Sequence, residues 1–244
     1  MVKPRISLVI PAYNEAGFIG RCLESVEKAK HRYRNPCSIE TIVVNNCSTD
    51  DTERIALRHN VRVVPEQKRQ IALARNKGVS VATGDIVGFL DADSTVSSNI
   101  FLLIDQAMSS GRYIGGGTDL ILERNSPGIF CTYCITKFPA MWLLGITGGL
   151  LFTNRKTFEE VGGFDESLYC AEDVKFALDL KRYGKEKGKK FRIITRAYVI
   201  SSARSFDKFG DWFYFKNLPR VLLSLKKITR DREFCDKFWY NVRT

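Results

Sequence analysis

Short apolar runs alternate with amphipathic stretches along the first half of the chain. Between the apolar runs, hydrophobic residues recur at helical spacing, which predicts helices at residues 16–29 and 67–82. The runs themselves are of strand length and lie at residues 6–10, 40–45, 61–65 and 86–90. This alternation indicates an α/β fold with a mainly parallel central sheet flanked by helices.

The pattern changes after about residue 112. A helix is predicted at residues 171–183 and a strand at 191–200. The apolar block at residues 138–152 is interrupted by one proline and three glycines and is too short for a membrane span, so we expect it to be buried protein. We divide the chain into an α/β unit, residues 1–205, and a helical C-terminal extension, residues 206–244, rich in aromatic and basic residues.

Three polar segments each follow a predicted strand directly: PAYNE (11–15), NNCSTDD (45–51) and DADS (91–94). In open parallel sheets, ligands bind beyond the carboxyl ends of the strands. We therefore expect the three segments to meet in one crevice.

Asp91 and Asp93 stand on either side of Ala92, at the end of the fourth apolar run. Extended backbone turns side chains i and i+2 to the same side, so both carboxylates can face one point. Two like charges at one point favour a cation, and a hard divalent ion that also needs phosphate oxygens fits best. The alternative is a solvated turn in which Asp93 or Ser94 caps a helix that begins near Val96.

Other strand-end residues offer further polar groups. Asn45 and Asn46 can point into the crevice while Ser48 and Asp51, spaced as a capping box, hold the turn. Glu15 either favours the positive end of the next helix or binds a ribose hydroxyl. Arg75, inside the predicted helix 67–82, is otherwise an ordinary surface charge.

The net charge of +11 calls for an anionic counterpart: nucleic acid, a lipid surface or a phosphorylated ligand. Acidic residues clustered at strand ends fit nucleic acid badly, so we expect no nucleic-acid partner. The seven cysteines form no disulfide pattern, and the first apolar run is too short for a signal peptide. We therefore expect a cytoplasmic protein, with contact at the inner face of the membrane as a further hypothesis.

Five segments occur in the order typical of one enzyme family: SLVIPAYNEAGFIGRCLESV, IVVNNCSTDDT, ARNKGVSVATGDIVGFLDADS, GGLLFTNRKTFEEVGGFDE and AEDVKFALDL. Residues 5–205 thus resemble the family 2 glycosyltransferases of the GT-A fold. The resemblance implies a Rossmann-like sheet, a nucleotide-sugar donor, and Mg²⁺ or Mn²⁺ bound by the Asp-x-Asp motif, Asp91 and Asp93. It also implies inverting transfer to a saccharide or lipid-linked acceptor.

The resemblance assigns the general base to Asp173, with Glu172 as its acceptor-binding partner. The alternative is that both are favourable first-turn acids of the helix 171–183. The resemblance also implies sugar or acceptor contacts at Gly148, Gly149 and Glu172. The residues it implies for contact with the donor nucleotide are Pro11, Tyr13, Glu15, Asn45, Asn46, Arg75, Asp91 and Ala92.

Asn45 and Asn46 depart from the Asp-Asp pair of most relatives. An amide accepts through oxygen and donates through nitrogen, which matches the N3–H and O4 of uracil or thymine and suits guanine less well. We therefore expect a UDP-linked donor. The competing hypothesis, a sugar-1-phosphate nucleotidyltransferase, calls for a glycine-rich, basic loop after the first strand, and PAYNEAGF is not such a loop.

Residues 206–230 mix aromatic with basic side chains, a composition suited to an interfacial helix. Two outcomes stay open from the sequence. The segment either contacts an anionic membrane peripherally or packs its aromatic residues on the α/β unit, residues 1–205.

Overall fold

The computed structural model describes residues 5–139, 144–213 and 215–216. Eight helices and eight strands alternate along these residues, with one short 3₁₀ turn, Pro36–Ser38. The strands are β1 (Ile6–Ala12), β2 (Ile39–Asn45), β3 (Arg62–Pro65), β4 (Ile86–Phe89), β5 (Ser94–Val96), β6 (Tyr113–Leu122), β7 (Leu151–Asn154) and β8 (Lys190–Ser201). The helices are α1 (Ile19–Arg32), α2 (Thr52–Ala56), α3 (Ile71–Ser80), α4 (Ile100–Ser109), α5 (Pro127–Pro139), α6 (Arg155–Val161), α7 (Glu172–Glu186) and α8 (Arg204–Phe209).

All eight strands join one sheet in the order β3-β2-β1-β4-β7-β6-β8-β5. The first four in this order are parallel, as the sequence predicts. Beyond them β7 is antiparallel to both β4 and β6, while β8 runs parallel to β6. Because two reversals restore the direction, β6 and β8 point the same way as β1, β2 and β4.

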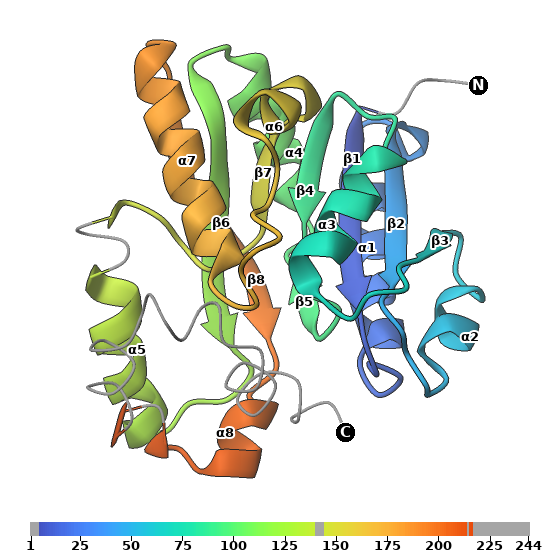
Figure 1. Cartoon of the computed structure of the whole chain (residues 1–244), viewed down its shortest axis with the longest axis vertical. Coiled ribbons are helices and arrows are strands. Elements are labelled where there is room, and N and C mark those ends of the chain that lie inside the picture. Colours follow the sequence, from blue (N-terminus) through green and yellow to red (C-terminus); the bar gives the residue numbers. More distant parts are fainter. Residues whose placement is uncertain (1–4, 140–143, 214, 217–244) are drawn as a thin grey trace.

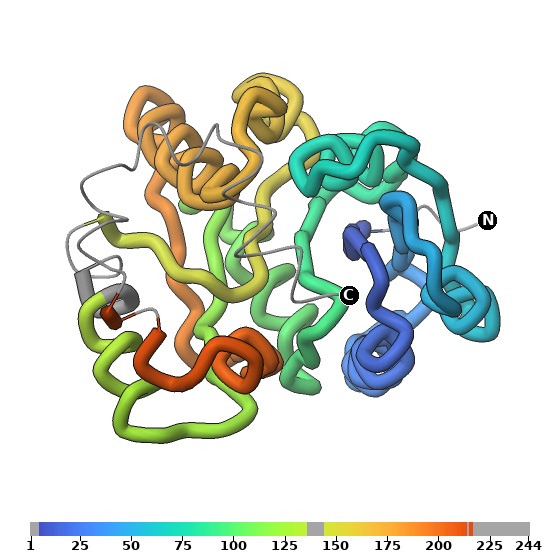
Figure 2. The backbone as a smooth tube through the Cα atoms, turned by 60° about the horizontal axis from the view of Figure 1, so that its bottom comes forward, coloured from blue at the N-terminus to red at the C-terminus, as the bar shows by residue number. Residues whose placement is uncertain are grey.

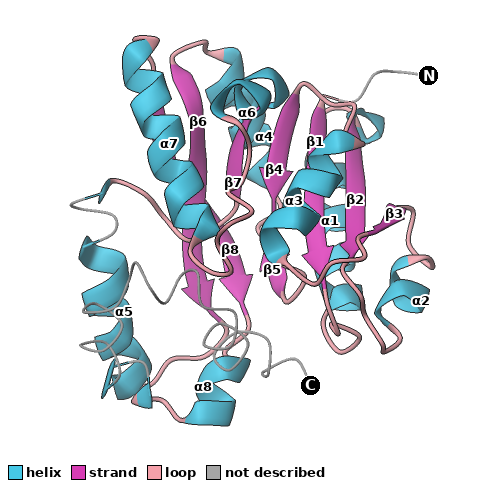
Figure 3. Cartoon of the chain, in the orientation of Figure 1, coloured by secondary structure: helices cyan, strands magenta, loops and turns pink. Residues whose placement is uncertain are grey.

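Helices cover both faces of the sheet (Figure 3). On one face α1 and α4 pack on a hydrophobic cluster that includes Leu8, Phe101 and Phe152. On the other face α3, α6 and α7 cover a second cluster. Its centre is a group of four mutually contacting rings: Phe89, Phe158, Phe164 and Phe176. The fold is thus a three-layer α/β sandwich with one core on each side.

The common direction of the strands defines a carboxyl edge of the sheet (Figure 1). β1, β2, β4, β6 and β8 end there, and the antiparallel β7 begins there. α5 and α8 lie beyond this edge and remain beside each other in the rotated view of Figure 2. Arg124, three residues before α5, ties the start of that helix to α8, because its guanidinium contacts Asp207 of α8 at 2.6 Å and Asp211 beyond it at 2.7 Å.

The predicted strands and long helices are confirmed, but two local predictions are wrong. No helix begins near Val96, because Ser94–Val96 pair with Val199–Ser201 as a short edge strand and the helix starts only at Ile100. Ser48 does not form a capping box: its hydroxyl accepts from the N–H of Asn14 and lies 3.4 Å from the carbonyl of Ala12, so it joins the β1 and β2 loops.

No helix in the part of the chain that the structure describes is long and apolar enough to cross a membrane. The apolar block at 138–152 is only partly described. Ile146 and Leu150 are buried, whereas Leu144 is exposed. Most of the segment 206–230 lies outside the described residues, so its predicted membrane contact stays a prediction. The predicted boundary between residues 205 and 206 falls inside α8.

Candidate functional site

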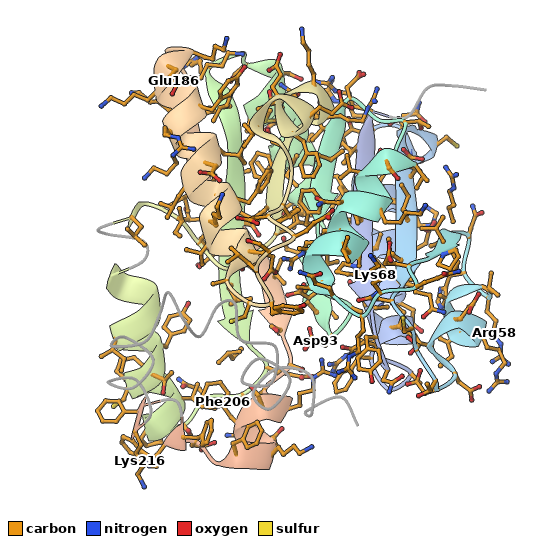
Figure 4. The ribbon with its side chains drawn as sticks, in the orientation of Figure 1. Arg58, Lys68, Asp93, Glu186, Phe206 and Lys216 are labelled. Atoms are coloured by element: carbon orange, nitrogen blue, oxygen red, sulfur yellow. The ribbon has the colours of Figure 1, made fainter. Side chains whose placement is uncertain are left out.

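The turn after β4 carries both aspartates of the Asp-x-Asp motif. Residues 92–93 form a tight turn, closed by a 3.1 Å hydrogen bond from the Ser94 N–H to the Asp91 carbonyl. The backbone is therefore not extended, and the i, i+2 argument from the sequence is wrong. Asp91 instead faces α3, while Asp93 faces the end of β8, with buried Ala92 between them. Figure 4 places Asp93 at the carboxyl edge of the sheet.

Arg75 of α3 links Asp91 to the first residue of α7. Its guanidinium donates to Asp91 Oδ1 at 3.0 Å and to Glu172 Oε1. The Arg75 and Glu172 side chains are 7% and 5% exposed, so this ion pair is buried. The alternative of Arg75 as a surface charge is excluded. Three elements, α3, the β4 turn and α7, are thus held together by one side chain.

The buried pair shifts the pKa values of both members. Burial raises the pKa of Glu172 to about 7, with the Arg75 guanidinium opposing the rise and Asp173 adding to it. Burial alone lowers the pKa of Arg75, but the attraction of Glu172, Asp91 and Asp173 outweighs it and the net shift is upward. Arg75 therefore remains a cation at any pH at which the protein is folded.

A second arginine contacts the other aspartate. Arg204, the first residue of α8, forms a bidentate pair with Glu15 at 2.7 Å for both contacts and lies 3.1 Å from Asp93 Oδ2. Ser202 donates to the same Asp93 oxygen at 3.0 Å. Glu15, 1% exposed, faces this cation rather than open solvent.

Sequence reasoning missed Arg204 and Ser202. A signal for them exists: both lie within three residues of the end of β8, the same position relative to a strand as the three polar segments identified from the sequence. The antiparallel insertion of β7, which reverses the chain direction twice, is what brings the end of β8 to the same edge.

A cleft opens beside Asp91. Its lining brings together Asp91, Arg75, Asp173, Gly148 and Gly149, which the sequence predicts as donor, catalytic and acceptor residues. Glu172 is buried and its carboxylate is engaged by Arg75, so the structure gives it no surface for an acceptor. The predicted acceptor contact of Glu172 stays untested.

The two glycines of the cleft differ in their surroundings. A Cβ on Gly149 would lie 2.3 Å from the Thr118 carbonyl oxygen, so this position requires glycine for close packing against β6. A Cβ on Gly148 would meet only Leu120 at an ordinary contact of 3.4 Å. Gly149 therefore has a packing role, whereas Gly148 faces the cleft without such a restraint.

The two amides predicted to read a nucleobase already bind protein groups. Asn46, 3% exposed, donates to the Lys68 carbonyl at 2.6 Å and accepts from the Gln70 N–H at 2.9 Å. Asn45 accepts from the Ser48 N–H and donates to Glu53. Both amides therefore fix loops next to the carboxyl edge, and their contact with a base stays a prediction.

A separate groove lies beside these loops. Tyr13 is part of its wall, with the Arg69 guanidinium 5.4 Å from the centre of its ring. Pro11, by contrast, is buried inside β1, where it pairs with Val44. The full lining is Tyr13, Cys47, Gln67, Lys68, Arg69, Gln70 and Tyr169.

Residues 7–119 match the family model described as Glycosyl transferase family 2. Glycosyltransferase GlyA of Streptococcus pneumoniae serotype 4 is 28% identical over 191 residues, covering 76% of this chain and 24% of GlyA. The chain spans about a third or less of the first curated relatives that it matches.

Among solved structures, mannosyltransferase PcManGT from Pyrobaculum calidifontis, in complex with GDP-Man and Mn²⁺, has a TM-score of 0.63 at 21% identity over 90% of this chain and 65% of its own. S. aureus TarS 1-349 in complex with UDP-GlcNAc has a TM-score of 0.59 at 17% identity, over 98% and 71%. These likenesses establish the GT-A fold.

Proposed function

We propose that this chain is a family 2 glycosyltransferase, because residues 7–119 match the model of that family. It would transfer a sugar from a nucleoside-diphosphate sugar to an acceptor hydroxyl or a lipid-linked acceptor, with inversion at the anomeric carbon. The observation that carries the proposal is the cleft that holds Asp91 and Asp173 together with Gly148. A leaving-group site and a base lie on opposite walls of a reaction centre in such a transfer, and these two aspartates come from different elements, the β4 turn and α7.

Asp91 and Asp93 would hold a Mg²⁺ or Mn²⁺ ion. Within the described residues no group of three or more His, Cys, Asp or Glu side chains is arranged to enclose a metal. Two carboxylates nevertheless fit a Mg²⁺-type ion, which keeps positions for water and substrate phosphates and needs only one or two protein carboxylates. When bound, the ion would neutralise the diphosphate as it leaves.

Asp173 acts as the base that takes the proton of the acceptor hydroxyl. It lines the cleft and is partly exposed, so an acceptor can reach it. Its neighbour Glu172 is withdrawn from the cleft by Arg75. We therefore give Glu172 a positioning role, in which its ion pair with Arg75 fixes the start of α7 and with it the direction of Asp173.

The nucleoside of the donor would occupy the groove lined by Tyr13 and Cys47, where an aromatic ring and basic side chains suit a base and its phosphates. The two similar folds bind UDP-GlcNAc and GDP-Man respectively, so fold likeness does not choose between uracil and guanine. Asn45 and Asn46 use their amides within the protein, so the UDP-linked donor stays a prediction from the sequence.

The acceptor side would lie toward α5 and α8. Phe130, Trp212 and Phe215 expose 57%, 44% and 40% of their surface there, and Lys216 is exposed beside them. Aromatic and basic side chains at one edge support peripheral contact with an anionic membrane, where a lipid-linked acceptor would be found.

The test of the proposed function is calorimetric titration of UDP and GDP into the full chain with and without Mn²⁺. Asp93→Asn keeps the shape and removes the charge of the metal ligand, so it should abolish the Mn²⁺-dependent part of nucleotide binding. Glu186→Gln, at the far end of α7 (Figure 4), is the matched control, because it also removes one carboxylate. This variant should bind nucleotide and Mn²⁺ as the wild type does. Undiminished Mn²⁺-dependent binding by Asp93→Asn would overturn the metal assignment.

A further inference from the structure

Arg204 is held so that it points at the metal-ligand candidate Asp93. Both terminal nitrogens donate to Glu15 at 2.7 Å, an arrangement that fixes the plane of the guanidinium. The Phe18 ring, 4.8 Å from the guanidinium carbon, supports it from one side. With its plane fixed in this way, the second nitrogen lies 3.1 Å from Asp93 Oδ2.

The contact with Glu15 is not one that Arg204 can readily leave. The Glu15 side chain is 2% exposed and that of Arg204 is 16% exposed, so separating them would leave a buried carboxylate without its cation. Arg204 therefore stays in place through its pair with Glu15, and Asp93 faces a fixed positive charge as a consequence.

Two carboxylates meet at Arg204. Its guanidinium contacts Glu15 and Asp93 at 2.7 and 3.1 Å, while Asp91 pairs with Arg75 instead. A divalent ion that approaches Asp93 therefore meets a guanidinium already bound to this ligand.

We propose that Arg204 keeps Asp93 from binding a divalent ion alone, so that the metal enters only together with the donor diphosphate. A diphosphate brings negative charge that offsets the repulsion between the ion and the guanidinium, whereas the free ion brings only positive charge. Arg204 is thus a positioning residue that couples metal binding to donor binding. This inference rests on the proposed metal-dependent function.

The test measures Mn²⁺ bound to the full chain by electron paramagnetic resonance, alone and with UDP or GDP, with a protein-free reference for Mn²⁺–nucleotide complexes. The wild type should bind Mn²⁺ alone at least tenfold more weakly than in the presence of a nucleotide. Arg204→Gln, which removes the charge, should bind Mn²⁺ alone at least tenfold more tightly than the wild type. Arg204→Lys, which keeps the charge, should resemble the wild type.

Arg21→Gln is the matched control. Arg21 lies over the same Phe18 ring at 5.3 Å but pairs with Glu123, so its loss changes the net charge equally without altering the partner of Asp93. Its affinity for Mn²⁺ alone should equal that of the wild type. A merely structural role for Arg204 would not tighten metal binding, and a general charge effect would appear in Arg21→Gln as well.

Two results would overturn the inference alone: a folded Arg204→Gln that binds free Mn²⁺ no more tightly than the wild type, or a wild type that binds Mn²⁺ equally well with and without nucleotide. The second result decides the matter even if Arg204→Gln does not fold. Absence of Mn²⁺ binding under every condition would instead remove the proposed metal-dependent function and the inference with it.

Discussion

Replacing Arg75 with methionine should leave Glu172 as a buried carboxylate without a cation. Methionine keeps apolar contact with Phe164, which lies 5.2 Å from the guanidinium carbon in the wild type. Because both members of the pair are almost completely buried, we expect a loss of about 3–5 kcal/mol in the free energy of unfolding. For a chain of this size this corresponds to a fall of roughly 6–20 °C in Tm.

The loss should depend on pH with a defined sign. The pKa of Glu172 is raised from 4.5 to about 7 in the folded protein, so the folded state binds the proton more tightly than the unfolded state. That contribution to stability is complete below pH 4.5 and is lost as the pH rises through 7. Without Arg75 the pKa rises further, and the variant continues to lose stability above pH 7. Its deficit relative to the wild type should therefore be larger at pH 8 than at pH 6.

Urea unfolding followed by circular dichroism at pH 6 and pH 8 measures both effects. Arg75→Met with Glu172→Gln should recover most of the lost stability, because neither charge is then buried alone. Arg54→Met, at an exposed pair with Asp51, is the control and should leave Tm unchanged. A deficit that is the same at both pH values, or a double variant no more stable than Arg75→Met, would refute the reasoning.

Four further outcomes are expected. Asp173→Asn should bind donor nucleotide as the wild type does but lose turnover with a hydroxyl acceptor; near-normal turnover would exclude it as the base. UDP should compete better than GDP for the donor site, and tighter binding of GDP would reject the pyrimidine preference. Gly149→Ala should lower Tm because its Cβ meets the Thr118 carbonyl, whereas Gly148→Ala should not; equal effects would contradict the packing account. Trp212→Ser with Phe215→Ser should weaken co-sedimentation with anionic vesicles, and unchanged binding would exclude this edge as the contact.

The sequence predicts the sheet well where a residue's environment is set by its own strand. Runs such as 6–10 and 86–90 are almost wholly apolar because both faces of the sheet are covered, and this signal is local. The strand Ser94–Val96 was not predicted, because it exists only through pairing with β8, over a hundred residues away in the chain. Pairing at that separation leaves no pattern in three residues.

In the candidate site, too, the residues with a local signal were predicted and those that depend on distant parts of the chain were not. The family resemblance assigns Asp91, Asp173 and Gly148 to one reaction, and the three residues do line one cleft. The partners of Glu15 and Asp93 were not predicted, since they depend on where β8 ends relative to β1. Likewise, the sequence offers Asn46 as a free amide, and only the path of residues 66–70 shows that its hydrogen bonds are used within the protein.

Because the candidate site lies at the carboxyl edge of the sheet, the protein can be immobilised through the opposite edge. The turn after α7, where Gly188 has a φ of +67°, is exposed from Lys185 to Gly188 and lies at the amino edge, opposite Asp93 in Figure 4. A label or surface tether attached at Glu186 would present the cleft outward to vesicles or bulky acceptors. Thiol attachment there would first require replacing the exposed Cys37 and Cys134, because both would compete for the reagent.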